Sequence, residues 1–410
     1  MPAKLGLLSR VVRVVTLMSS APVAVTLAAT PPPLAGFPSC DYSSWSVVGE
    51  IPTGDRAHWS PDGQHFVAGR NIYDTEACPA GATEPCQPIG EIPWDRVLYR
   101  PTWSFDGEVI VFDAPAGPVE VPGEIYSVQS EGEGTQLFAW HRPSGVISQL
   151  TSREIHRSAS FARFAHQSLT LTWITQGLET GTQFVPMIAE LVVEGDGTAH
   201  LEDTEALVEA EGDPGYGAFN RIGEFSADDG GILLISTRSH SGDGEVWRID
   251  LATREWANLT DAPTSWEEHP RSSPNGQKIT FMSTRAYPGL ANLGLAIGWF
   301  LGLPSSHDTV LILPYAVAGT ALGFSGEQYL ANPDGTEAAS PTLGTELDIA
   351  HGWFSRGAEF SPDGRKLAIA QRPRASVTLP VLPPYLIQYN DRVTGRNPRT
   401  VILEFDCAEP

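Results

Sequence analysis

Basic residues are scarce in this sequence, and lysine is almost absent. The 410 residues contain 26 Lys and Arg against 49 Asp and Glu, which gives a formal net charge of −23. The only lysines are Lys4, Lys278 and Lys366. A surface that binds nucleic acid or anionic lipid needs clustered positive charge. We therefore expect neither nucleic acid nor anionic lipid to be the main partner.

Catalytic and metal-binding motifs are also missing. The sequence contains no His-Glu-x-x-His, no Gly-x-Ser-x-Gly, no phosphate-binding loop and no Cys-x-x-Cys. The acidic stretch from Glu194 to Asp213 lacks the Asp-x-Asp-x-Asp-Gly spacing of a calcium loop, and it is interpreted as a solvated insertion. No metal, no cofactor and no catalytic residue is therefore predicted.

The first 30 residues have the features of an export signal. Lys4, Arg10 and Arg13 are basic, the stretch from Val14 to Ala29 is apolar and rich in small residues, and no acid precedes Asp41. Residues 1–30 are predicted as a signal peptide and residues 31–44 as a linker, with an uncleaved N-terminal anchor as the alternative. The mature protein is then expected in the periplasm or outside the cell.

One short pattern recurs along the rest of the chain. It consists of an aromatic residue, then Ser-Pro-Asp-Gly or a variant, then an apolar run. Pro presets the first turn position, Asp caps the turn backbone and Gly takes a positive φ, so each copy predicts a hairpin. The six copies are anchored at Trp59, Trp103, Phe164, Phe225, Ser272 and Phe360. The shorter spacings match one four-stranded propeller blade of roughly 40–50 residues, and the longer ones leave room for insertions.

These copies resemble the TolB-type propeller repeat, whose core is Trp-Ser-Pro-Asp-Gly and whose last strand ends in Leu-Thr, as at Leu150-Thr151 and Leu259-Thr260. The resemblance covers roughly residues 45–405. It implies an all-β fold, a six-bladed β-propeller of four-stranded antiparallel blades at residues 45–407. TolB also has a separate N-terminal α/β domain, for which there is no room here, so its role in the cell envelope does not carry over.

A propeller must close its ring, because an open sheet edge is costly. The strand predicted at Trp45 to Ile51 is expected to join the last blade, beside Tyr385 to Tyr389 and Thr400 to Phe405.

The chain has four cysteines, an even number that favours two disulfides in an oxidising compartment. Cys40 and Cys407 flank the first and last predicted strands, so a bond between them would join the ends of the ring. Cys78 and Cys86 would close a loop within one Pro- and Gly-rich stretch. A lipid anchor on Cys40 is the alternative for that residue.

Basic residues also precede the six anchors, on the strands expected to line the central channel. The candidate ligand-binding residues are Arg56, His58, Arg100, Arg163, Arg221, His269, Arg271 and Arg356. Unpaired, the six arginines would form a positive funnel for a carboxylate, phosphate or sulfate. The favoured interpretation is that they pair with Asp55, Glu224, Glu268 and Glu359, because like charges crowded on one axis recruit partners.

Residues 286–325 form an insertion unlike the rest of the chain. It is apolar, and Gly294, Gly298 and Gly302 recur every four residues. It is expected to pack against the propeller, because large exposed apolar patches are unusual. The alternative is that residues 290–324 contact a protein partner or a membrane.

The sequence predicts an exported, non-enzymatic propeller that binds or scaffolds a protein, peptide or glycan. The alternative is a glycan lyase or hydrolase with histidines and carboxylates at the channel mouth, since propellers host both binding proteins and enzymes. His58, Glu268 and His269 are the residues that best fit an active site of this kind.

Overall fold

The computed structural model describes most of the chain beyond the first 33 residues. The described residues are 34, 36–53, 57–82, 86–115, 135–152, 155–163, 169–176, 184–208, 218, 220–239, 244–262, 265–285, 326–348, 351–373 and 397–408. The predicted signal peptide, residues 31–33 and 35 of the predicted linker, Arg56, Tyr385 to Tyr389 and the insertion at residues 286–325 lie outside these ranges. Within them, no helix has the length and apolar character needed to span a membrane.

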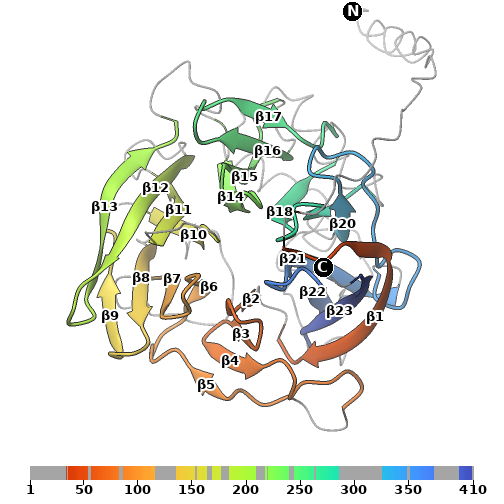
Figure 1. Cartoon of the computed structure of the whole chain (residues 1–410), viewed down its shortest axis with the longest axis horizontal. Coiled ribbons are helices and arrows are strands. Elements are labelled where there is room, and N and C mark those ends of the chain that lie inside the picture. The colour runs from red at the N-terminus through yellow and green to blue at the C-terminus, as the bar shows by residue number, and fades with distance from the viewer. Residues whose placement is uncertain are drawn as a thin grey trace, which may run out of the picture.

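The described elements are all strands, and they form six antiparallel sheets around a common axis (Figure 1). This arrangement confirms the predicted six-bladed β-propeller, of the kind that the TolB-type repeats imply. From the axis outward, blade 1 consists of β2 (Ala57–Trp59), β3 (His65–Ala68), β4 (Asn71–Asp74) and β5 (Gly90–Glu91). Blade 2 consists of β6 (Tyr99–Trp103), β7 (Val109–Pro115), β8 (Thr135–His141) and β9 (Val146–Gln149).

The middle blades continue the same order from the axis outward. Blade 3 consists of β10 (Ile155–Phe161), β11 (Leu169–Gln176), β12 (Phe184–Val193) and β13 (Ala199–Ala206), and blade 4 of β14 (Asn220–Phe225), β15 (Gly231–Ser236), β16 (Glu245–Asp250) and β17 (Trp256–Asn258). Blade 5 has three described strands, β18 (Glu267–Ser272), β19 (Ile279–Ser283) and β20 (Glu327–Ala331), with an isolated bridge from Leu330 to Ala339 beside the last of them.

The sixth blade contains strands from both ends of the described chain. From the axis outward it consists of β21 (Trp353–Phe360), β22 (Lys366–Pro373), β23 (Arg399–Cys407) and β1 (Cys40–Ile51). The pairing of β1 with β23 confirms the predicted closure of the ring, although β1 begins at Cys40 rather than at Trp45. Residues 40–44, which the sequence analysis assigned to a linker, therefore belong to the strand.

Both predicted disulfides are present. Cys40 and Cys407 are directly paired across β1 and β23, with their Cα atoms 4.0 Å apart, and the second bond joins Cys78 to Cys86. The first bond links the two strands that close the ring.

The repeated turns have the predicted chemistry. In four of them a serine Oγ donates to the aspartate two residues later, at 2.5–2.6 Å: Ser60 to Asp62, Ser104 to Asp106, Ser226 to Asp228 and Ser361 to Asp363. In blade 5 Ser273 donates to Asn275 in the same way. Gly63, at φ 71°, takes the left-handed conformation that the motif requires.

The third anchor predicted from the sequence, Phe164, lies outside the described residues. Phe161 ends β10 and pairs with Leu171, as Trp59 ends β2 and pairs with Phe66. The anchor of blade 3 is therefore Phe161, and Arg163 follows it instead of preceding it.

The core lies between neighbouring blades. Strands such as β15 are apolar and buried along their whole length, because each inner strand is covered by a blade on both sides. One cluster joins Ile174 of blade 3 to Phe225 and Trp247 of blade 4. This packing holds the innermost strands of adjacent blades close together near the axis.

Candidate functional site

Six side chains occupy equivalent positions, each one residue before the end of an innermost strand. We call them the inter-blade ring, and they are His58, Thr102, Ser160, Glu224, Arg271 and Glu359. The inner edge of each of these strands has no neighbouring strand, so its N–H groups need other acceptors. Three members of the ring accept such N–H groups from the next blade: His58 from Trp103, Glu224 from Ser272 and Glu359 from Trp59.

His58 and Glu359 form a coupled pair across the seam between blades 1 and 6. Nε2 of His58 lies 3.2 Å from Glu359 Oε1 and 3.0 Å from Thr102 Oγ1. Burial raises the pKa of Glu359 to about 8. Burial, together with the nearby charges of Arg271 and Arg163, lowers the pKa of His58 well below its usual value. At neutral pH the pair is therefore a protonated carboxyl beside a neutral imidazole.

The raised pKa of Glu359 predicts a loss of stability as the pH rises from 6.5 to 8. Over that interval the carboxyl is protonated when folded but ionised in the unfolded chain, where its pKa is 4.5, so folding takes up a proton. His58, with its lowered pKa, instead costs stability mainly below pH 6.5, so it contributes little to this window. The expected change is about 2 kcal/mol.

Thermal unfolding of Glu359→Gln at several pH values checks this expectation. The variant should lose less stability than the wild type between pH 6.5 and 8. Burial also raises the pKa of Glu267, but that contribution is common to both proteins and cancels in the comparison. Parallel pH profiles for the two proteins would contradict the assignment.

Glu224 connects three blades. Its Oε2 lies 2.8 Å from Arg163 Nη2 of blade 3 and 3.3 Å from Arg271 Nη1 of blade 5, and its Oε1 accepts the N–H of Ser272. The carboxylate is almost fully buried, so its charge is balanced by these guanidinium groups rather than by water. One carboxylate therefore forms ion pairs with two arginines.

A second acidic centre lies at Glu268. Its Oε2 is 2.9 Å from His269 Nε2, and its Oε1 accepts a hydrogen bond from Trp266 Nε1 at 3.0 Å and lies 3.7 Å from Arg221 Nη1. Burial opposes ionisation of Glu268, but His269, Arg221 and Trp266 together hold its pKa well below the usual range. Glu268 is thus an ionised, fully engaged carboxylate.

The structure favours paired arginines over the alternative of a funnel of unpaired arginines. Four of the six form ion pairs: Arg100 with Asp113 at 2.9 Å, Arg163 and Arg271 with Glu224, and Arg221 with Glu268. Arg356 is half-buried on β21. Pairing with Asp55, Glu224, Glu268 and Glu359 was the interpretation favoured from the sequence. Glu224 and Glu268 do pair, Asp55 lies outside the described residues, and Asp113 was not foreseen.

Bulges explain why these side chains point in different directions. The pairing register shifts within β6, β10, β14, β18 and β21. Arg100, Ser158 and His269 have φ values of 47°, 59° and 59°, which non-glycine residues seldom adopt. At the bulge of β14 a Cβ on Gly223 would lie 2.2 Å from the carbonyl oxygen of Pro270, so this close approach of blades 4 and 5 requires glycine. A bulge re-aims side chains, and bulges are common beside functional sites.

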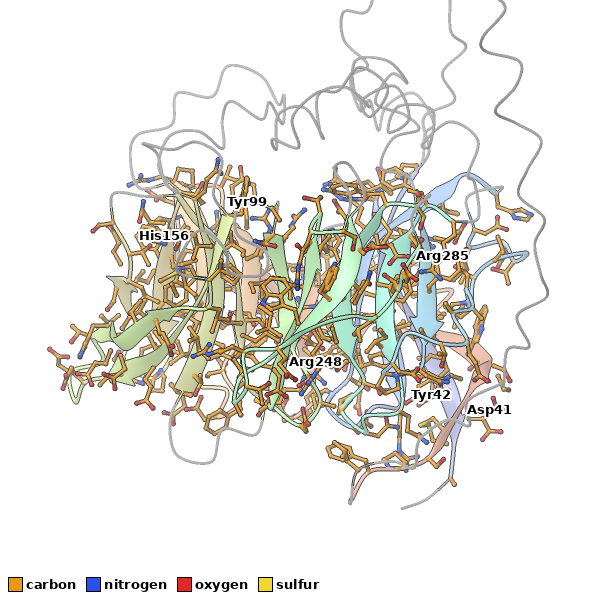
Figure 2. All side chains as sticks on the ribbon, turned by 90° about the horizontal axis from the view of Figure 1, so that it is seen from above. Asp41, Tyr42, Tyr99, His156, Arg248 and Arg285 are labelled. Atoms are coloured by element: carbon orange, nitrogen blue, oxygen red, sulfur yellow. A yellow bond between two sulfur atoms is a disulfide. The ribbon has the colours of Figure 1, made fainter. Side chains whose placement is uncertain are left out.

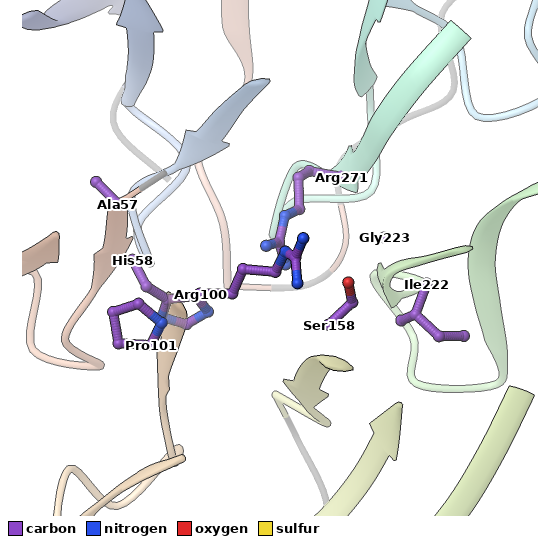
Figure 3. Close-up of a pocket in the computed structure, with 8 residues that line it drawn as sticks. All are labelled: Ala57, His58, Arg100, Pro101, Ser158, Ile222, Gly223 and Arg271. Carbon is purple, nitrogen blue, oxygen red and sulfur yellow. The ribbon is translucent and has the colours of Figure 1, made fainter. Parts of the chain in front are cut away.

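The bulges surround a small pocket on the axis (Figure 3). It is lined by Ala57, His58, Arg100, Pro101, Ser158, Ile222, Gly223 and Arg271, and it spans about 310 Å³ with open solvent included. Of the predicted ligand-binding residues, the pocket brings together His58, Arg100 and Arg271. Ser158 was missed by the sequence analysis. No cluster of three or more His, Cys, Asp or Glu suited to a metal occurs among the described residues.

No protein-family model and no curated protein matches the sequence. Among solved structures, one assigned to TolB of Agrobacterium tumefaciens is 13% identical, with 88% of this chain and 99% of that chain covered and a TM-score of 0.44. TolB from Acinetobacter baumannii is 12% identical, covering 92% of this chain and 67% of that one, with a TM-score of 0.42. Prolyl oligopeptidase B from Galerina marginata is 11% identical, with 80% and 38% covered and a TM-score of 0.42. This chain thus spans well under half of that peptidase, and the six-bladed fold rests on the strands described above.

Proposed function

We propose that this protein is an exported, non-catalytic propeller that binds a protein, peptide or glycan. The two disulfides support export, because such bonds persist in oxidising compartments. The basic and apolar composition of residues 1–30 supports it independently. Export then places the protein in the periplasm or outside the cell.

One face of the propeller carries the proposed partner site. We call it the upper face: it is the face on which the innermost strands begin, and Tyr99, His156 and Arg285 lie toward it in Figure 2. The repeated Ser-Pro-Asp-Gly turns end the innermost strands and therefore lie on the opposite, lower face.

Arginine–aromatic stacks on the upper face are the observation that carries the proposal. There are five among the described residues, distributed around the ring: Arg96 on Trp94, Arg157 on Phe184, Arg238 on Trp247, Arg285 on Phe281 and Arg399 on Trp353. The distances from guanidinium carbon to ring centroid are 3.9–5.6 Å. Apart from Trp94, the rings are buried, so this face presents the guanidinium groups, and arginine is enriched in protein interfaces. A partner with acidic or aromatic groups would complement these stacks.

The enzyme alternative is less well supported by the site. His58 contacts Thr102, Trp103 and Glu359 of neighbouring blades, and His269 contacts Glu268 of its own strand, so both histidines are already engaged. A general base must reach the proton that it abstracts. Side chains that are buried and engaged in this way are better suited to holding blades together than to receiving a substrate.

Binding measurements on peptide and glycan arrays, followed by calorimetry on the best ligand, test the proposal. The double variant Arg238→Gln with Arg399→Gln should bind at least about tenfold more weakly, because it removes two guanidinium groups, and a hydrogen bond to a charged group contributes roughly 1.5–3 kcal/mol. Arg142→Gln is the matched control, since Arg142 stacks on Trp103 at 4.7 Å but bonds to Gly107 in a lower-face turn.

Analysis of the same ligands after incubation separates the two functions. The binding proposal expects them to be recovered intact. Shortened or unsaturated products that disappear in His58→Ala or His269→Ala would contradict it and establish the enzyme. Equal loss of binding in Arg142→Gln and in the double variant would remove the upper face as the partner site.

A further inference from the structure

Arg100 and Arg271 line the same pocket from opposite sides of the channel. Arg100 comes from β6 of blade 2 and Arg271 from β18 of blade 5, which lie on opposite sides of the six-bladed ring. Figure 3 shows both side chains directed into the same pocket. Arg100 pairs with the buried carboxylate of Asp113 at 2.9 Å, and the two cations repel each other unless negative charge also lies beside Arg271.

The negative charge near Arg271 is limited. Its Nη1 shares Glu224 with Arg163, so one carboxylate is divided between two cations. Its Nη2 lies 3.9 Å from Glu359, which is longer than a hydrogen bond. The raised pKa of Glu359, about 8, keeps that carboxyl uncharged at neutral pH.

Ser158 contributes an unused hydroxyl to the pocket. The residue is only 4% exposed, and its Oγ has no hydrogen-bond partner among the described residues. Buried hydroxyl groups are nearly always hydrogen-bonded, so this one is arranged for an acceptor that comes from elsewhere.

The backbone holds both residues in unfavourable conformations. Arg100 has a φ of 47° and Ser158 a φ of 59°, each within a bulge. Strain of this kind persists where the surrounding structure imposes it, and it is concentrated at ligand sites. Both residues line the same pocket.

We propose that Arg100, Arg271 and Ser158 form a binding site for a carboxylate group on the propeller axis. A planar guanidinium matches the two oxygens of a carboxylate, and a serine hydroxyl donates to the same group. A carboxylate at this position can belong either to a small free acid or to the end of a peptide chain. The site lies in the channel and is separate from the upper-face stacks, so it stands whether or not a partner binds there.

Calorimetric titration of the full chain at fixed ionic strength tests the site with four probes: acetate, trialanine, trialanine amide and inorganic phosphate. The free acids should bind, and the amide should bind at least about tenfold more weakly. Binding of acetate alone identifies a small-acid site, and tighter binding of trialanine identifies a chain-end site. Equal binding of trialanine and its amide, or binding of phosphate without either acid, overturns the proposal.

Substitutions assign the binding to these residues. Arg100→Gln should weaken acetate or trialanine binding at least about tenfold, and Ser158→Ala about threefold or more. Arg248→Gln is the matched control, because Arg248 pairs with Asp250 at 3.1 Å away from the channel. Ser158→Ala preserves both arginines, so it tests the site even if Arg100→Gln destabilises the fold. Unchanged affinity in Ser158→Ala, or equal weakening in Arg248→Gln, contradicts the assignment.

Discussion

Replacement of Cys40 and Cys407 by serine is expected to cause a large loss of stability. The bond spans a sequence separation of 367 residues, so it restricts nearly the whole unfolded chain. The chain-entropy relation gives an upper limit of about 5–6 kcal/mol. The loss should appear as a lower urea midpoint, and β1 and β23 should be the first strands to lose protection against hydrogen exchange.

The second disulfide provides the control for this experiment. Cys78 and Cys86 are separated by only 8 residues, for which the same relation gives about 2.5 kcal/mol. The serine pair at Cys78 and Cys86 should therefore cost less than the pair at Cys40 and Cys407. Equal losses in the two double variants would show that loop closure is not the origin of the effect.

Glu224→Ala is expected to cost about 3–5 kcal/mol, because it removes one partner from a buried ion pair. The substitution leaves Arg163 and Arg271 without the carboxylate that they share, and it leaves the N–H of Ser272 without its acceptor. Three blades lose a common contact at once. Urea unfolding of the purified variant gives the change in free energy.

Glu205→Ala is the matched control for Glu224→Ala. Glu205 forms an ion pair with Arg254, but both side chains are largely exposed to solvent. An exposed pair contributes no more than about 1 kcal/mol, so this variant should be close to the wild type. If Glu224→Ala were equally mild, the buried carboxylate would not be what ties blades 3, 4 and 5 together.

Local turn chemistry explains why the blades could be predicted from the sequence. Ser, Pro, Asp and Gly act within a few residues of one another, so each copy of the motif locates its own hairpin. Blade 3 lacks the motif, and both Phe161 and Phe164 precede the same apolar run. The choice between them depends on the pairing of Phe161 with Leu171, a contact between strands that residue type alone does not determine.

The candidate site was less predictable, because bulges change the side of the strand on which a residue lies. Arg100 lies within a bulge and Arg271 follows one, so counting back from an anchor does not give their orientation. Ser158 has no sequence signal, since only its positive φ and its unpartnered hydroxyl distinguish it. Asp113 did have a sequence signal, because it is a lone acid in the apolar strand β7, where a buried carboxylate requires a basic partner.

The pairing of β1 with β23 has a mechanical consequence. A pulling force applied through the segments before Cys40 and after Cys407 meets two residues that are already covalently bonded, with Cα atoms 4.0 Å apart. The disulfide carries the load, and the six blades between the cysteines lie outside the path of the force. Under tension the propeller should therefore resist extension until the disulfide is reduced, and only then should its blades be pulled apart in sequence from the seam.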